Sequence, residues 1–186
     1  LNDVYSTPPA KGRSRGQDMW GMRLSKGPAP GDITGMRAIG VDYSGKSGAA
    51  ALLAIVDKIE GGQRRQWLWH AAGGAQQVSP DGRTFSITQG DASLKGTLVA
   101  PAGARVIAAS PIIEHLTLTE EDAGYKVNSS GFIINAEPGT SFFAVLTLQR
   151  GAPPEVAVES GAGLDSVVRV GGQKVRFDGQ KVLIGE

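Results

Sequence analysis

The chain has 186 residues, of which 27 are glycine, 10 are proline and none is cysteine. Its 19 basic and 18 acidic residues give a net charge of +1, so no strong overall field attracts nucleic acid or an anionic membrane. The lack of cysteine excludes disulfides, thiolate metal sites and a cysteine nucleophile, and no apolar run reaches the roughly 18 residues of a membrane-spanning helix.

The first part of the chain has the composition of an arm. In residues 1–34 prolines, glycines and basic residues leave little apolar surface to bury, so we expect an extended or flexible segment. Met19-Trp20-Gly21-Met22 interrupts it, and two readings stay open: a contact that pins the arm to the body, or an isolated apolar group in a tail. Residues 35–186 are predicted to form one β-sandwich domain.

The strand signals begin at Met36. The apolar run Ala49–Ile59 and the segment Arg64–Ala72 predict two strands of a hairpin. Because strand side chains alternate, we expect Trp67 and Trp69 on one face of it and His70 on the other. Residues 48–60 are rich in alanine and would also suit a helix, but the density of turns favours strands.

The middle of the chain predicts further short strands. Ser79-Pro80-Asp81-Gly82 is a turn sequence, with proline to preset φ and glycine to accept a positive φ. Phe85 and Ile87 alternate with polar residues, as in a half-buried strand. The segment 141–148 is apolar on both faces, which is typical of a central strand. Other candidate strands are residues 94–99, 106–113, 125–127 and 132–134, the last two flanking Ser129-Ser130-Gly131.

The C-terminus predicts a three-stranded meander. Segments 166–170, 173–177 and 180–184 are separated by Gly171-Gly172 and Asp178-Gly179, which match the hairpin turns that twisted strands prefer. Ten or more strands at hairpin spacing indicate an all-β fold, an antiparallel β-sandwich that ends in this meander.

Gly40–Ser47 matches the phosphate-loop pattern G-x-x-x-x-G-K-[ST] at each fixed position. In that motif backbone N–H groups surround a phosphate, and the lysine reaches its outer oxygens. A phosphate-loop domain needs a parallel sheet covered by helices, whereas the chain downstream predicts hairpins. We therefore expect a glycine-rich loop between strands, and keep nucleotide binding through Gly40–Ser47 as an alternative.

Other catalytic or metal-binding signals are sparse. His70 and His115 are the only histidines and lie far apart in sequence, so no close-spaced pair indicates a zinc site. Four acidic residues lie around His115, namely Glu114, Glu120, Glu121 and Asp122. They could bind calcium, but a solvated loop is the more common role of such a stretch. The residues do not indicate an assembled Ser-His-Asp triad. We expect no catalytic site, cofactor or metal in this chain alone.

Two interpretations of the aromatic residues stay open. Trp67, Trp69 and Tyr43 could form a platform on which a sugar ring stacks, while core packing is the commoner role of a tryptophan pair on a strand. Cationic groups at the start of the same strand, Arg64 and Arg65, would suit an acidic sugar, and His70 is a further contact candidate.

Several segments resemble the C-terminal β-sandwich region of heparinase II/III-like polysaccharide lyases. These are ALLAIVDKIEGG (51–62), QWLWHA (66–71), FSITQGDASLKGTLVAP (85–101), SFFAVLTLQRGAPPEV (141–156) and the closing VGGQKVRFDGQKVLIG (170–185). The resemblance covers about residues 36–186. It concerns strand patterns and not a catalytic signature.

The resemblance implies a function and partners. These lyases carry an upstream helical domain that holds much of their catalytic machinery, and helices of that kind are not predicted here. The chain would thus be a non-catalytic β-sandwich portion, structural and in contact with an acidic polysaccharide, beside an upstream helical domain of the same protein. A free-standing carbohydrate-binding module is the alternative. We expect a secreted or periplasmic location, with no nucleic-acid or membrane partner.

Overall fold

The computed structural model describes residues 34–61, 65–71, 73–109, 130–136 and 140–185. In these ranges the regular structure consists of antiparallel strands in three sheets and a short 3₁₀ turn. The predicted all-β, antiparallel architecture is confirmed. Within the same ranges, no helix is both long and apolar enough to cross a membrane.

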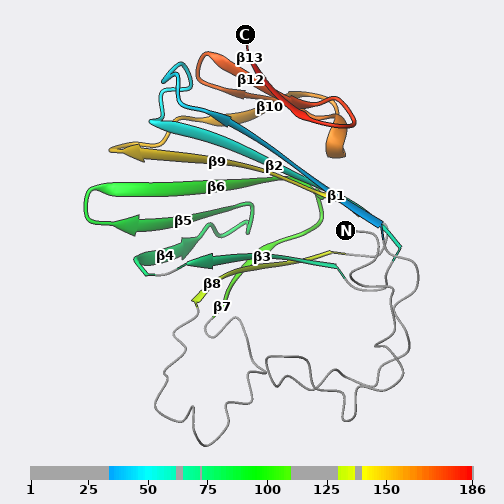
Figure 1. Cartoon of the computed structure of the whole chain (residues 1–186). Helices are drawn as coiled ribbons and strands as arrows, with labels where there is room; N and C mark the ends of the chain where they lie inside the picture. The colour runs from blue at the N-terminus through cyan, green and yellow to red at the C-terminus, as the bar shows by residue number, and fades with distance from the viewer. Residues whose placement is uncertain (1–33, 62–64, 72, 110–129, 137–139, 186) are drawn as a thin grey trace, which may run out of the picture.

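A six-stranded sheet forms the middle layer of the molecule (Figure 1). Every neighbouring pair in it is antiparallel. In spatial order its strands are β1 (Thr34–Asp42), β2 (Ala51–Glu60), β9 (Phe142–Arg150), β6 (Ala92–Ala100), β5 (Thr84–Gln89) and β4 (Ala75–Val78).

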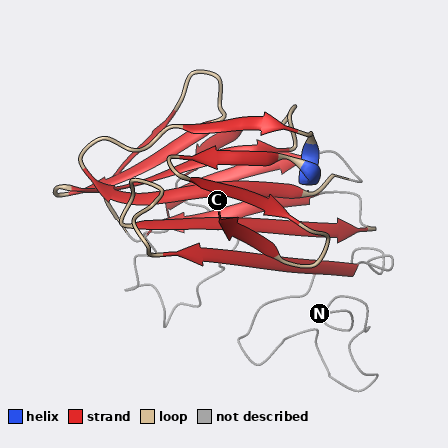
Figure 2. Cartoon of the chain, turned by 90° about the horizontal axis from the view of Figure 1, so that it is seen from above, coloured by secondary structure: helices blue, strands red, loops and turns tan. Residues whose placement is uncertain are grey.

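Two smaller sheets cover the two faces of this middle sheet (Figure 1). The three-stranded sheet has the order β3 (Arg65–Ala71), β8 (Ser130–Ala136) and β7 (Val106–Ala109). The four-stranded sheet consists of β10 (Val156–Ser160), β11 (Val167–Val170), β12 (Gln173–Phe177) and β13 (Val182–Gly185), with the 3₁₀ turn η2 (Gly163–Asp165) before β11. Viewed from above, strands of the stacked layers run in broadly similar directions (Figure 2).

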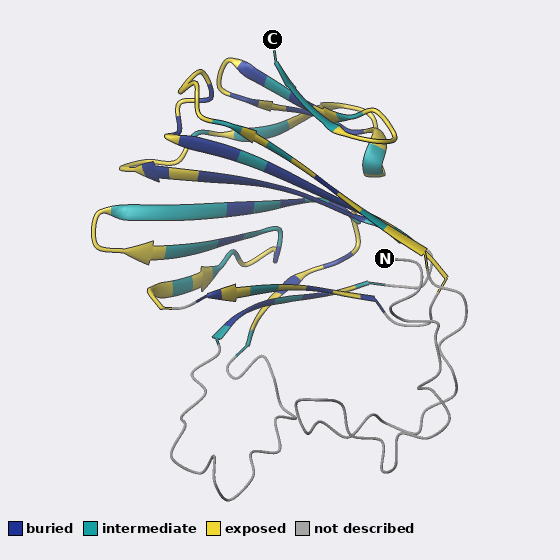
Figure 3. Cartoon of the chain, viewed as in Figure 1, coloured by how far each residue is buried: buried dark blue, intermediate teal, exposed yellow. Residues whose placement is uncertain are grey.

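Strand β9 contributes to both hydrophobic cores. Because its side chains alternate, Phe142, Ala144 and Leu146 enter the core against the three-stranded sheet, called here the lower core. Phe143 and Val145 enter the upper core, against the four-stranded sheet. This explains why 141–148 is apolar on both faces, and Figure 3 shows β9 mostly in the colour of buried residues.

The turn predictions are confirmed where a short loop closes a local pair. Gly82 N–H donates to Ser79 O at 2.8 Å, which closes the predicted Ser79–Gly82 turn. Gly171-Gly172 joins β11 to β12, and Gly171 has a φ of 55°, a value that favours glycine. The meander is present, with β10 as a fourth strand. Its last loop is longer than predicted, because Phe177 pairs with Val182 and β13 begins there.

The predicted hairpin between Ala49–Ile59 and Arg64–Ala72 is wrong. Both segments are extended, but β2 pairs with β1 and β9 in the middle sheet, whereas β3 pairs with β8 in another layer. A strand in the interior of a sheet pairs with a neighbour on each side. A hairpin with β3 would supply β2 with a partner on one side only. Ser130 and Gly131 lie inside β8 and not in a loop, while the predicted strand 125–127 lies outside the described residues.

Candidate functional site

Trp67 belongs to the lower core and not to an exposed platform. Its side chain is only 3% exposed and stacks on that of Trp69, with ring centroids 5.7 Å apart. Trp69 is partly buried and packs against Phe85 from the middle sheet. The inner face of β3 thus turns both indoles toward the middle sheet, which agrees with the core-packing interpretation of the pair and not with an exposed sugar platform.

Arg65 is also an interior residue. It is 5% exposed, and its guanidinium donates hydrogen bonds to the backbone oxygens of Thr140 and Gly61. These bonds tie the start of β3 to the segments before β9 and after β2. Both terminal nitrogens of Arg65 are therefore engaged by the chain itself, while Arg64 lies outside the described residues.

Tyr43 and His70 are exposed, but the structure does not bring them together. Tyr43 follows the end of β1 and is 76% exposed. His70 lies near the end of β3, on the outward side of the three-stranded sheet, where it pairs with Gly131. Tyr43 lies in the loop after β1 of the middle sheet and His70 lies on the outward side of the three-stranded sheet, so the two do not form one site.

The phosphate-loop-like segment Gly40–Ser47 begins in β1 and leads back to an antiparallel strand, β2. Its backbone is used for contacts between layers: Lys46 O accepts a hydrogen bond from Gly172 N–H at 3.0 Å. Gln173 Nε2 donates to Asp42 Oδ2 at 3.3 Å and to Ser44 Oγ at 3.2 Å. The segment therefore connects the middle sheet to the four-stranded sheet.

No metal centre is evident in the described ranges. They contain no group of three or more His, Cys, Asp or Glu side chains that could hold an ion. His115 and the acidic residues around it lie outside these ranges.

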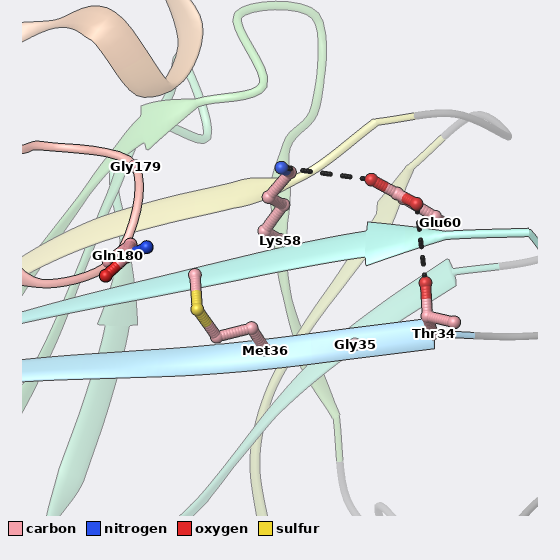
Figure 4. Close-up of a pocket in the computed structure, with 7 residues that line it drawn as sticks. All are labelled: Thr34, Gly35, Met36, Lys58, Glu60, Gly179 and Gln180. Atoms are coloured by element: carbon pink, nitrogen blue, oxygen red, sulfur yellow. Dashed lines mark hydrogen bonds and ion pairs between the residues drawn. The ribbon is translucent and has the colours of Figure 1, made fainter. Parts of the chain in front are cut away.

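One shallow groove lies between the start of β1, the end of β2 and the loop before β13 (Figure 4). It has a volume of about 510 Å³. Its polar side chains interact with one another, since Lys58 Nζ lies 3.8 Å from Glu60 Oε1 and Thr34 Oγ1 donates to Glu60 Oε2 at 3.4 Å. Because these charges are already paired, the groove has little left to offer an ionic ligand.

A second groove lies on a polar face of β4, β5 and β6, and we call this face the hydroxyl face. Phe85 points into the lower core, so its neighbours Thr84 and Ser86 point the opposite way. The groove has a volume of about 440 Å³. The hydroxyl face consists of six of the residues that line it: Gln77, Thr84, Ser86, Thr88, Ser93 and Lys95.

The strand register arranges the hydroxyl face in rows. Gln77 pairs with Ser86, and Ser86 pairs with Lys95. Thr88 pairs with Ser93 in the next row. Side chains opposite one another in neighbouring strands lie about 5 Å apart, so hydroxyl, amide and ammonium groups form a continuous polar surface. Figure 3 shows β5 and β6 less buried than β2 and β9.

Two buried polar residues of β9 border this face. Thr147 is 0% and Gln149 4% exposed, and they pair with Lys95 and Ser93. Gln149 Nε2 donates to Ser93 Oγ at 2.9 Å. Gln149 Oε1 and Thr147 Oγ1 have no hydrogen-bond partner among the described residues. Buried acceptors without partners are uncommon and point to a missing donor.

Among the residues that the structure describes, Lys95 is the only charged one that lines the second groove. No ion pair to it is found among the described residues. The groove therefore offers one cation, several hydroxyls, the side-chain amide of Gln77, and the edges of Pro80 and Pro153.

Comparison with known proteins leaves the family open. No family model matches the chain, and a search of curated proteins finds no matching relative.

The hydroxyl face was not recognised as a site from the sequence, although its signal was present. Thr84, Ser86 and Thr88 alternate with Phe85 and Ile87, and that pattern was used only to predict a strand. A polar side made almost wholly of hydroxyls, on two consecutive strands, is the feature that could have identified it.

Proposed function

We propose that this chain is the non-catalytic β-sandwich portion of a heparinase II/III-like polysaccharide lyase, and that it contacts polysaccharide through the hydroxyl face. The observation that carries the contact is the groove of about 440 Å³ lined by hydroxyl, amide and ammonium groups on β4, β5 and β6. Its size falls within the usual range of ligand sites.

The chemistry of the face suits a sugar chain. Serine and threonine hydroxyls both donate and accept hydrogen bonds, as sugar hydroxyls do, so pairs can form in either direction. Lys95 supplies a donor with positive charge, which favours an acidic polysaccharide.

The non-catalytic role is supported by where the reactive residue types lie. Elimination from a uronic acid needs a base, an acid and a group that neutralises the carboxylate, all within reach of one sugar. Tyr43 lies in the loop after β1 and His70 in the three-stranded sheet, and both terminal nitrogens of Arg65 donate to backbone oxygens. The chain would form one wall of a cleft, with the upstream helical domain as the other.

Affinity electrophoresis in gels that contain uronate polymers tests the binding. We expect retardation of the chain, reduced about fivefold for each hydrogen bond lost in Ser86→Ala and Thr88→Ala. Gln180→Ala, in the first groove, is the matched control and should leave retardation unchanged. Equal effects of the two sets of variants would contradict the hydroxyl face as the contact.

An activity assay tests the non-catalytic role. The chain alone should give no ultraviolet absorbance from unsaturated sugar products with any of these polymers. Sustained turnover that is lost in His70→Ala or Tyr43→Phe would show that a complete catalytic site is present after all.

A further inference from the structure

The cross-strand pair Gln149–Ser93 determines how one hydroxyl of the groove can be used. Gln149 lies on β9 directly opposite Ser93 on β6, and its Nε2 donates to Ser93 Oγ at 2.9 Å. An amide nitrogen only donates, so this bond occupies a lone pair of the serine oxygen. With Gln149 buried, its amide is held in place.

The serine hydrogen must then point elsewhere. A hydroxyl has a single hydrogen, and no acceptor for it is found among the described residues. Since Ser93 lines the groove, the direction left for its O–H is toward the groove. Ser93 is thereby biased to donate to a ligand and not to accept from it.

Lys95 places a second donor beside this one. It lies two positions after Ser93 on the same face of β6, about 7 Å along the strand. An ammonium group donates and cannot accept. The nearest acidic residue in sequence, Asp91, is an exposed partner of Arg150 at 3.0 Å and does not line the groove.

We propose that Gln149 is a positioning residue that fixes Ser93 as a donor, and that Ser93 and Lys95 together form a donor subsite for an oxyanion substituent of the bound glycan. The inference depends on the proposed function, because it assigns specificity to the same groove. A carboxylate and a sulfate both present the required acceptor oxygens, and either can accept two charge-assisted hydrogen bonds.

Matched polymers test this on the full chain. The probes are polygalacturonate and its methyl ester, which share a backbone, and dextran sulfate with dextran. We expect the acid form to bind about tenfold more tightly than the ester, a difference typical of one charge-assisted hydrogen bond. Preference for dextran sulfate over dextran without preference for polygalacturonate over its ester would assign the subsite to sulfate.

A double-mutant cycle isolates the role of Gln149. Glutamate at this position accepts from Ser93 and turns its lone pairs toward the groove, so Gln149→Glu should weaken binding of the acid form and leave the ester unchanged. In Ser93→Ala the same substitution should add no further loss. An equal loss in both backgrounds would mean simple charge repulsion and would overturn the proposal.

Thermal unfolding of each variant shows whether it folds. If Gln149→Glu does not fold, Gln149→Met removes the donor without adding charge, and the preference for acid over ester should narrow. An unchanged preference would overturn the inference. Equal binding of acid and ester, and of dextran sulfate and dextran, would also overturn it but leave the proposed function standing, whereas no binding of any polymer would contradict both.

Discussion

Arg37 and Asp57 form a two-pronged ion pair across the neighbouring strands β1 and β2. Arg37 Nε lies 2.6 Å from Asp57 Oδ1, and Nη2 lies 2.7 Å from Oδ2. The aspartate side chain is only 8% exposed, against 55% for the arginine. This hydrogen bond raises the pKa of Arg37. The guanidinium thus replaces much of the water that the buried carboxylate has lost.

Arg37→Met should lower the free energy of unfolding by about 2 kcal/mol, because it leaves a buried carboxylate without its partner. Urea unfolding measures this. Arg150→Met is the matched control, since the Arg150–Asp91 pair is 80% and 70% exposed and should contribute under about 0.5 kcal/mol. Similar losses of unfolding free energy in the two variants would show that the burial of Asp57 does not determine how much the ion pair contributes to stability.

Gly96→Ala should destabilise the protein by about 3 kcal/mol. A Cβ at this position would lie 2.3 Å from Phe85 Cε1 and Cζ, and the Phe85 ring is packed in the lower core. Gly103→Ala is the control, because a Cβ there has no neighbour within 4 Å. Thermal unfolding should separate the two variants clearly, and equal midpoints would show that the Phe85 ring can move aside.

Arg83→Met should also destabilise the fold, by about 3 kcal/mol, because several backbone oxygens lose a charged donor at once. The Arg83 guanidinium donates to the backbone oxygens of Leu98, Val99, Pro101, Ala102 and Ala104. Desolvation by burial lowers the pKa of Arg83.

The control for this prediction is Arg105→Met. Arg105 donates to a single exposed oxygen, that of Pro80, and its loss should have a much smaller effect. Arg83→Lys should recover only part of the stability, since an ammonium cannot reach as many acceptors. If Arg83→Lys recovered the full stability, positive charge alone, and not the planar set of guanidinium donors, would stabilise the backbone at residues 98–104.

Acid should weaken the loop between β12 and β13. Asp178 accepts hydrogen bonds from the N–H groups of Lys181 at 2.9 Å and Gln180 at 3.0 Å, and these hold the pKa of Asp178 below its ordinary value. A lowered pKa means that the stabilisation is complete above the unfolded value of about 3.9 and disappears as the pH falls through the folded one.

Asp178→Asn should therefore reduce the loss of stability that the protein shows below about pH 4. Carboxyl chemical shifts followed by NMR give the pKa of Asp178 directly. A titration midpoint at or above the ordinary value would contradict the role of the two backbone donors.

Local parts of the fold could be predicted from the sequence, whereas pairings between distant strands could not. The Gly171-Gly172 turn brings together residues that are neighbours in the chain, so the turn chemistry alone determines the pairing. Ala51 pairs with Leu148, and no local signal specifies that contact. The hairpin error at β2 and β3 arose because the glycines after Glu60 resemble a tight turn.

The candidate site was less predictable for a related reason. The alternation of residue types predicted which side chains of a strand share a face. Which of the two faces is buried depends on where the neighbouring sheet lies, and the sequence does not show this. Trp67 and Trp69 do share a face, yet it is the inner one. The hydroxyls of β5 were read as the solvent side of an ordinary strand, and the role of Gln149 depends on its pairing with β6, which the sequence does not reveal.

The central position of β9 imposes an order on assembly during synthesis. Leu148 pairs with Ala51 of β2 on one side and with Leu94 of β6 on the other, so both earlier strands leave the ribosome with an unpaired edge. Such edges readily pair with other chains. A translation product that stops before β9 would therefore expose two unpaired strand edges, one on β2 and one on β6. A product that stops just after β9 would contain all six strands of the middle sheet.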